Sequence, residues 1–132
     1  MIIGIGTDLL DIRRIERTLE RFGDRFIARI YTKSERAKAE KRVNVAAAYA
    51  LRYAAKEACS KALGTGLREG VFWRDMETNS LPSGKPTITL TGGALKKLQS
   101  LTPSGMTAKV EVTMSDEHPM AHAMVVIFAI PL

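Results

Sequence analysis

The sequence predicts an α+β fold in which a largely antiparallel sheet packs on a long central helix. An apolar, β-branched segment opens the chain, helical segments follow, and the last half consists mostly of segments that alternate apolar and polar residues. Between them lies an alanine-rich stretch without glycine or proline, which predicts the central helix. No linker or internal repeat divides the sequence, so we expect residues 1–132 to form a single domain.

The first third of the chain predicts a buried strand followed by short helices. Asp11 follows the apolar opening strand and is placed to cap a helix, since apolar residues recur after it at spacings of three and four. Gly23 is expected to end that helix. After a second apolar patch, Thr32 or Ser34 is expected to cap a short, charged helix that ends near Arg42.

The rest of the chain predicts one long helix and then mostly strands. Residues 44–63 predict the long helix, and the glycines that follow them are expected to end it. The other predicted elements are strands over residues 71–78, 87–90, 109–114 and 121–130, a turn over 81–86, a helix over 92–101 and a tight connection over 115–119.

The composition favours a cytoplasmic protein with an anionic partner. Twenty lysines and arginines against 14 acidic residues give a net charge of +6. Aromatic residues make up only 6%, which weakens a nucleic-acid interpretation because single-stranded bases stack on such side chains. Cys59 is the only cysteine, and we expect it to pack in the long helix rather than to react. No apolar run reaches the roughly 18 residues of a membrane span, and no signal-peptide pattern opens the chain.

Two acidic residues in apolar surroundings are candidates for metal binding. Asp8 lies near the end of the opening strand, and Glu57 lies in the alanine-rich helix. Magnesium uses one or two carboxylates and completes its shell with water and substrate phosphate. Lys61 follows Glu57 by one helical turn, and at Gly64 the backbone could approach a bulky anion. Together these residues would suit a pyrophosphate.

Each of these residues also has a simpler interpretation. A glutamate four residues before a lysine is the favourable orientation for a surface ion pair, so Glu57 and Lys61 could pair with each other. Asp8 could help to begin the first helix. The spacing of these residues in the sequence does not decide between metal binding and the simpler interpretations.

Two further features point to anionic ligands. The turn that contains Lys85 and Pro86 could present a lysine to a phosphate, although such a turn is more often an ordinary hairpin connection. The first helix carries four arginines within nine residues, among them Arg14 and Arg21, which favours docking of an acidic partner. Glycine fingerprints of dinucleotide-binding and P-loop proteins are absent.

The sequence resembles the holo-[acyl-carrier-protein] synthases, the small bacterial type of 4′-phosphopantetheinyl transferase. The resemblance rests on residues 4–16 (GIGTDLLDIRRIE), residues 52–66 (RYAAKEACSKALGTG) and the turn Gly84-Lys85-Pro86, with a weaker match in the last two strands. It runs nearly from end to end, and the block over residues 52–66 is its most specific part.

This resemblance implies an activity and partners. The chain would transfer the 4′-phosphopantetheine group from coenzyme A to a serine of an acidic apo acyl carrier protein, in support of fatty acid biosynthesis. It would need Mg²⁺ and would leave adenosine 3′,5′-bisphosphate. A homotrimer with active sites at the subunit interfaces is expected, with neither nucleic acid nor a membrane as partner.

The resemblance also implies roles for individual residues. They are Mg²⁺ binding by Asp8 and Glu57, catalysis by Glu57 and Lys61, coenzyme binding by Lys61, Gly64, Lys85 and Pro86, and carrier-protein binding by Arg14 and Arg21. One departure matters, because many family members have a histidine where this chain has Met114. Any role of that histidine cannot be transferred, and His118 is not in register with it.

Two other classes of function are kept as alternatives. The charge alone would allow a small nucleic-acid-binding module, whose affinity would fall steeply with salt and would need neither magnesium nor coenzyme A. A purely structural interaction domain would show neither salt-dependent nucleic-acid binding nor a transfer reaction that needs magnesium and coenzyme A.

Overall fold

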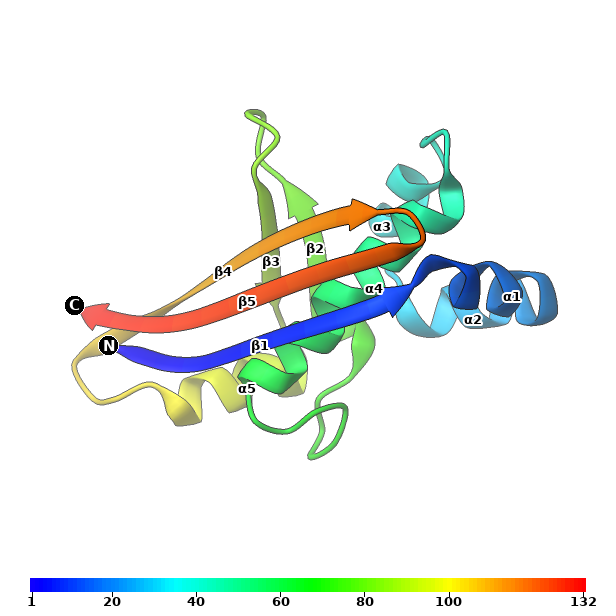
Figure 1. Cartoon of the computed structure of the whole chain (residues 1–132). Helices are drawn as coiled ribbons and strands as arrows, with labels where there is room; N and C mark the ends of the chain where they lie inside the picture. The colour runs from blue at the N-terminus through cyan, green and yellow to red at the C-terminus, as the bar shows by residue number, and fades with distance from the viewer.

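The centre of the protein is helix α4 (Val45–Ala62), which lies against one face of a three-stranded antiparallel sheet (Figure 1). The computed structural model describes residues 1–132. In the sheet, β5 (Met120–Pro131) is the central strand, and β1 (Ile2–Asp11) and β4 (Met106–Glu117) form its two edges. This arrangement confirms the predicted α+β class and the position of the long helix.

Five short helical elements complete the fold. They are α1 (Ile12–Phe22), α2 (Asp24–Ile30), α3 (Lys33–Ala39), the 3₁₀ helix η1 (Trp73–Asp75) and α5 (Gly92–Leu101). Helices α1 to α3 pack around the N-terminal half of α4, and α5 packs at its C-terminal half (Figure 1). None of the helices is both long and apolar enough to cross a bilayer.

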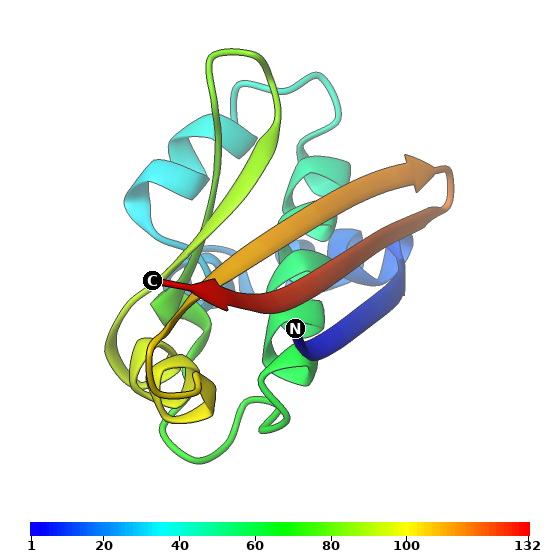
Figure 2. The same cartoon turned by 90° about the vertical axis from the view of Figure 1, so that its left-hand side faces the viewer.

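The remaining strands form a second, separate sheet. β2 (Met76–Ser80) and β3 (Pro86–Leu90) pair as an antiparallel hairpin that packs on the side of α4 away from β1 (Figure 2). The prediction of largely antiparallel pairing is therefore confirmed, with the strands divided between two sheets.

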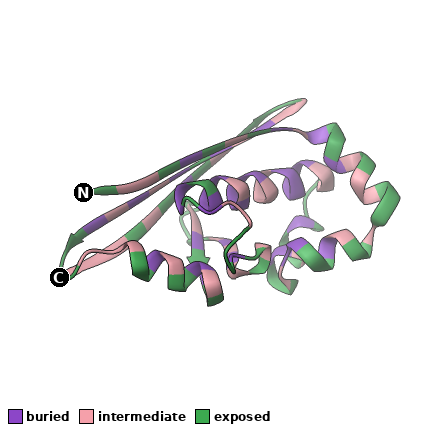
Figure 3. Cartoon of the chain, turned by 90° about the horizontal axis from the view of Figure 1, so that it is seen from below, coloured by how far each residue is buried: buried purple, intermediate pink, exposed green.

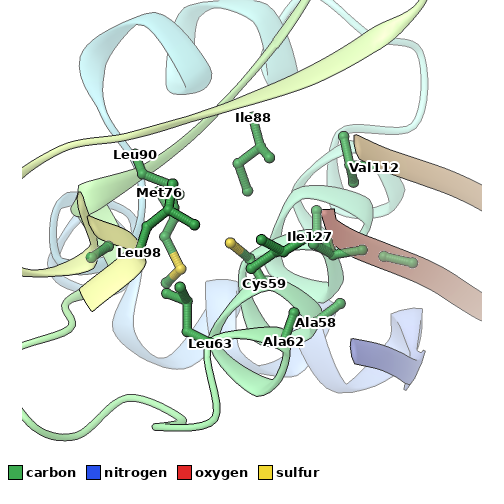
Figure 4. Packing of buried hydrophobic residues seen from close by; sticks show 14 of the residues in the cluster. Ala58, Cys59, Ala62, Leu63, Met76, Ile88, Leu90, Leu98, Val112 and Ile127 are labelled. Carbon is green, nitrogen blue, oxygen red and sulfur yellow. The ribbon is translucent and has the colours of Figure 1, made fainter. Parts of the chain in front are cut away.

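Helix α4 is alanine-rich because it is surrounded. Eleven of its residues are buried, and Figure 3 shows buried positions along most of its length. Its C-terminal half packs into a cluster that includes Met76 of the hairpin and Ile127 of β5 (Figure 4). Cys59 lies within this cluster, and burial raises the pKa of its thiol to about 12, so the prediction that Cys59 packs rather than reacts agrees with its position.

Local capping explains where the helices begin. The Asp11 carboxylate accepts a hydrogen bond from the backbone of Arg13 at 2.9 Å, as the sequence predicted for the start of α1. Thr32, rather than Ser34, caps α3 in a capping box with Glu35. Asn44 caps α4.

Several predicted boundaries were wrong, among them the start of β4, which lies at Met106 rather than at residue 109. The strand expected over residues 71–78 begins only at Met76, because the Asp75 N–H donates to the Phe72 carbonyl oxygen at 3.0 Å in a 3₁₀ turn, and the Asp75 carboxylate caps that turn by accepting from the Phe72 N–H. The helix expected to reach Arg42 ends at Ala39 and continues only as tight turns. The strands around the predicted 115–119 connection pair as far as Glu117 and Met120, so the connection is shorter than expected.

Two glycines of β1 allow the strand to touch the backbone of α4. A Cβ atom added to Gly6 would lie 1.9 Å from the carbonyl oxygen of Ala58, and one added to Gly4 would lie 2.0 Å from that of Ala62. No larger residue fits without separating the strand from the helix. Because residues alternate along a strand, Asp8 points to the same side as Gly4 and Gly6, towards α4.

We therefore predict that Gly6→Ala destabilises the protein by roughly 2 kcal/mol or more, because the strand must move away from α4. Thermal unfolding followed by circular dichroism measures the change, and Thr7→Ala, on the opposite face of the same strand, is the control. An unchanged melting temperature for Gly6→Ala would contradict the close contact.

Candidate active site

The structure brings Asp8 and Lys61 into direct contact where β1 meets the C-terminal half of α4. Lys61 Nζ donates hydrogen bonds to Asp8 Oδ1 at 3.1 Å and to the Thr7 carbonyl oxygen at 3.0 Å. The Asp8 side chain is largely buried and that of Lys61 is half exposed. This contact joins residues that are 53 positions apart in the chain.

Glu57 lies in the same cluster, one helical turn before Lys61. Burial raises the pKa of Glu57, and the negative charge of Asp8 raises it further. The positive charges of Lys61 and Arg14 partly offset this increase in the pKa. The two carboxylates therefore lie close enough to repel each other, and a cation between them would relieve that repulsion.

The pair of carboxylates meets the requirements of magnesium. The chain contains no group of three or more histidine, cysteine, aspartate or glutamate side chains that could form a complete metal site. Magnesium needs no such group, because it keeps several waters and binds through one or two carboxylates and substrate phosphates. Asp8 and Glu57 supply two partly buried carboxylates, so the residues present fit this ion.

The simpler interpretations of these residues do not describe the structure. Lys61 forms its ion pair with Asp8, and no ion pair joins it to Glu57. Asp11, not Asp8, caps the first helix. Asp8 therefore has no role in beginning α1.

Gly64 lies two residues after the end of α4, close in sequence to Lys61. Its φ of 83° is in the left-handed region, and no atom lies within 4 Å of a Cβ added there. Its N–H donates to the Lys61 carbonyl oxygen at 3.0 Å, so it closes the helix and is not free for an anion. A ligand could therefore approach Gly64 only from the side that a side chain would otherwise occupy.

The structure places Lys85 and Pro86 away from the carboxylates. Lys85 Nζ lies 3.1 Å from Glu111 Oε2 on β4. Because β4 and β1 are opposite edges of the sheet, one chain does not bring Lys85 to Asp8. Within a single chain, the predicted coenzyme site is divided between these two edges.

The predicted docking arginines lie along α1. Arg14 is exposed, and its charge lowers the pKa of Glu57, so this end of the helix borders the carboxylate cluster. Arg21 lies about 10 Å further along the helix axis and packs over the Phe22 ring at 5.1 Å. Arg25 and Arg29 of α2 line a pocket together with Thr18 and Phe22 of α1.

Sequence reasoning missed a basic cavity beside the N-terminal half of α4. The cavity has a volume of about 530 Å³, and Lys41, Arg42 and Arg52 contribute three positive charges against the one negative charge of Asp116. Burial lowers the pKa of Arg52, whose Nη1 donates to the Ala48 carbonyl oxygen at 2.9 Å. One sequence feature could have pointed to this cavity: Arg52 is the first residue of the block over residues 52–66, the most specific part of the resemblance.

Comparison with known proteins defines the class to which this fold and site belong. The profile of the 4′-phosphopantetheinyl transferase superfamily matches residues 4–123. A holo-[acyl-carrier-protein] synthase from Methylobacterium nodulans is 61% identical over 131 residues, which is 99% of each chain.

Solved structures agree with this relationship. The holo-[acyl-carrier-protein] synthase from Neisseria meningitidis has a TM-score of 0.85 and 36% identity, covering 97% of this chain and 99% of its own. The Helicobacter pylori holo-[acyl-carrier-protein] synthase, in complex with coenzyme A, has a TM-score of 0.80 and 29% identity, covering 94% and 99%. The chain belongs to the holo-[acyl-carrier-protein] synthase family of 4′-phosphopantetheinyl transferases.

Proposed function

We propose that this protein transfers the 4′-phosphopantetheine group of coenzyme A to a serine of apo acyl carrier protein. The products are holo carrier protein, as fatty acid biosynthesis requires, and adenosine 3′,5′-bisphosphate. The observation that carries the proposal is the convergence of Asp8, Glu57 and Lys61 in a chain of this family. A relative's structure in complex with coenzyme A supports the choice of donor.

In the proposed reaction, the serine oxygen forms a bond to the β-phosphorus of coenzyme A while the bond to the bridging oxygen breaks. Such transfers depend on positioning and on neutralising charge. Lys61, which lies beside Asp8, would stabilise the negative charge that develops on the leaving phosphate. The serine proton passes to Glu57 or to a nearby water. Asp8 and Glu57 would hold Mg²⁺, which supplies positive charge at the pyrophosphate.

We propose that the active protein is a homotrimer whose sites each use two subunits. Ile5, Leu9 and Met124 lie on the sheet face away from α4 and are 59%, 64% and 37% exposed. An apolar sheet face of this kind gains stability when another copy covers it. Assembly would also let Lys85 and Pro86 of one chain complete the carboxylate site of its neighbour.

The basic cavity around Arg52 fits the same donor, because coenzyme A carries a 3′-phosphate in addition to its pyrophosphate. No feature of the fold favours a nucleic-acid-binding module or a structural domain over the transferase. The cytoplasmic location expected from the sequence stays a prediction.

The direct test is to incubate the protein with apo acyl carrier protein, coenzyme A and Mg²⁺ and to measure the carrier by mass spectrometry. We expect a mass gain of one phosphopantetheine group. Glu57→Gln and Lys61→Met should each lower kcat by about 100-fold or more, because each removes a group that acts on the transferring phosphate. An unmodified carrier, or a fully active Glu57→Gln variant, would refute the proposal.

The arginine surface of α1 generates a separate prediction. Arg14→Glu should raise KM for the carrier protein by about 10-fold and change KM for coenzyme A much less, because only the carrier is expected to dock there. Steady-state kinetics with each substrate varied in turn measures both constants. Lys96→Glu, the same charge reversal on α5 at a distant part of the molecule (Figure 1), is the control. Equal increases for both substrates would count against docking on α1.

A further inference from the structure

One ion pair in this protein is completely buried, and the proposed reaction does not use it. Lys56 and Glu35 each have 0% of their side chain exposed, and Lys56 Nζ lies 2.8 Å from Glu35 Oε1. Burying two charges is expensive unless every donor and acceptor finds a partner. No buried side-chain polar atom of the chain lacks a hydrogen bond, so this condition is met.

Lys56 uses its three donors to tie α4 to α3, to η1 and to the start of β2. Besides Glu35, its ammonium donates to the carbonyl oxygens of Trp73 at 3.0 Å and of Met76 at 2.7 Å. These acceptors bracket the 3₁₀ turn η1. The position of Trp73 relative to α4 is therefore fixed by Lys56.

Glu35 anchors the other end of the pair through four contacts. Its Oε1 accepts from the Thr32 backbone at 2.9 Å as well as from Lys56. Its Oε2 accepts from the backbone and the hydroxyl of Thr78 at 2.9 and 2.6 Å. The carboxylate thus joins α3, α4 and β2 at one point.

A continuous path of contacts leads from this ion pair to the carboxylate cluster. The Trp73 ring packs on the Tyr53 ring, with centroids 4.7 Å apart. Tyr53 precedes Glu57 by four residues, so the two side chains lie on the same face of α4, and the Tyr53 side chain acts to lower the pKa of Glu57. Lys56 itself is the residue next to Glu57.

We propose that Lys56 is a positioning residue, which together with Glu35 fixes Trp73 and Tyr53 so that Glu57 faces Asp8. The inference rests on the proposed function. Helix α4 is held from two sides, by the backbone of β1 at Gly6 and by the Lys56 ammonium from the side of η1 and β2. Both restraints act within two turns of Glu57. Side chains that orient a reacting group in this way typically change activity or metal affinity by about 10 to 100-fold when they are replaced.

The test compares Lys56→Met with the double variant Glu35→Gln/Lys56→Met. The single variant leaves a buried carboxylate without its cation and should lower the melting temperature strongly. The double variant removes both charges, so we expect it to recover much of that loss while still lacking the bonds to Trp73 and Met76. In the double variant, kcat should fall at least 10-fold and the Mg²⁺ concentration for half-maximal rate should rise by a similar factor. KM for the carrier protein should change less than about twofold, because α1 is untouched.

Arg36→Met is the matched control, since Arg36 also lies on α3 but forms its ion pairs with Asp24 and Glu40 at the surface. It should leave kcat and the Mg²⁺ dependence unchanged. If both Lys56 variants fail to fold, Thr78→Val decides, because it removes only the hydroxyl contact to Glu35 and should still raise the Mg²⁺ requirement. The positioning role is overturned if the double variant folds and has the kinetics of the wild type. If the double variant does not fold, the same result for Thr78→Val overturns it. An inactive wild-type protein instead overturns the proposed function, so the two failures are distinguishable.

Discussion

The close contact between the backbones of β1 and α4 is the constraint on which the site depends. Gly4 and Gly6 leave no side chain between strand and helix, and the alanines opposite them leave little on the helix. The strand therefore lies directly against α4. Asp8, two residues after Gly6, comes within hydrogen-bonding distance of Lys61. A wider separation would reduce the burial of Glu57 and its repulsion by Asp8, the two causes that raise the pKa of Glu57.

Because other elements pack around most of α4, side chains of this one helix contribute to several different sites. Successive residues of a helix point about 100° apart, so neighbours in sequence reach different partners. Lys56 points into the interior towards Glu35, whereas Glu57 points towards the β1 edge. Arg52 lies earlier on the helix and faces a separate basic cavity. The alanines between them fill the remaining contacts without crowding either sheet.

Features that depend on neighbours in sequence could be predicted, and features that depend on distant partners could not. Asp11 and Gly23 mark the ends of α1 because capping acts over a few residues. The 3₁₀ turn at Trp73 escaped prediction because the Phe72 backbone and Asp75 exchange hydrogen bonds there, with the Asp75 carboxylate accepting from the Phe72 N–H, despite the apolar strand pattern. The contact of Glu35 with Thr78 joins residues 43 positions apart and has no local signature. For the same reason, spacing alone could not decide between a metal pair of Asp8 and Glu57 and their simpler interpretations, and the family resemblance was needed to favour the pair.

The most direct measurement of the central claim is Mn²⁺ binding followed by electron paramagnetic resonance, with Mn²⁺ as a spectroscopic substitute for Mg²⁺ and coenzyme A present. If Asp8 and Glu57 share one ion, the wild-type protein should bind about one Mn²⁺ per chain, and Asp8→Asn and Glu57→Gln should each weaken binding by at least about 10-fold. Wild-type affinity in both variants would contradict the account, because the ion would then be held by other groups.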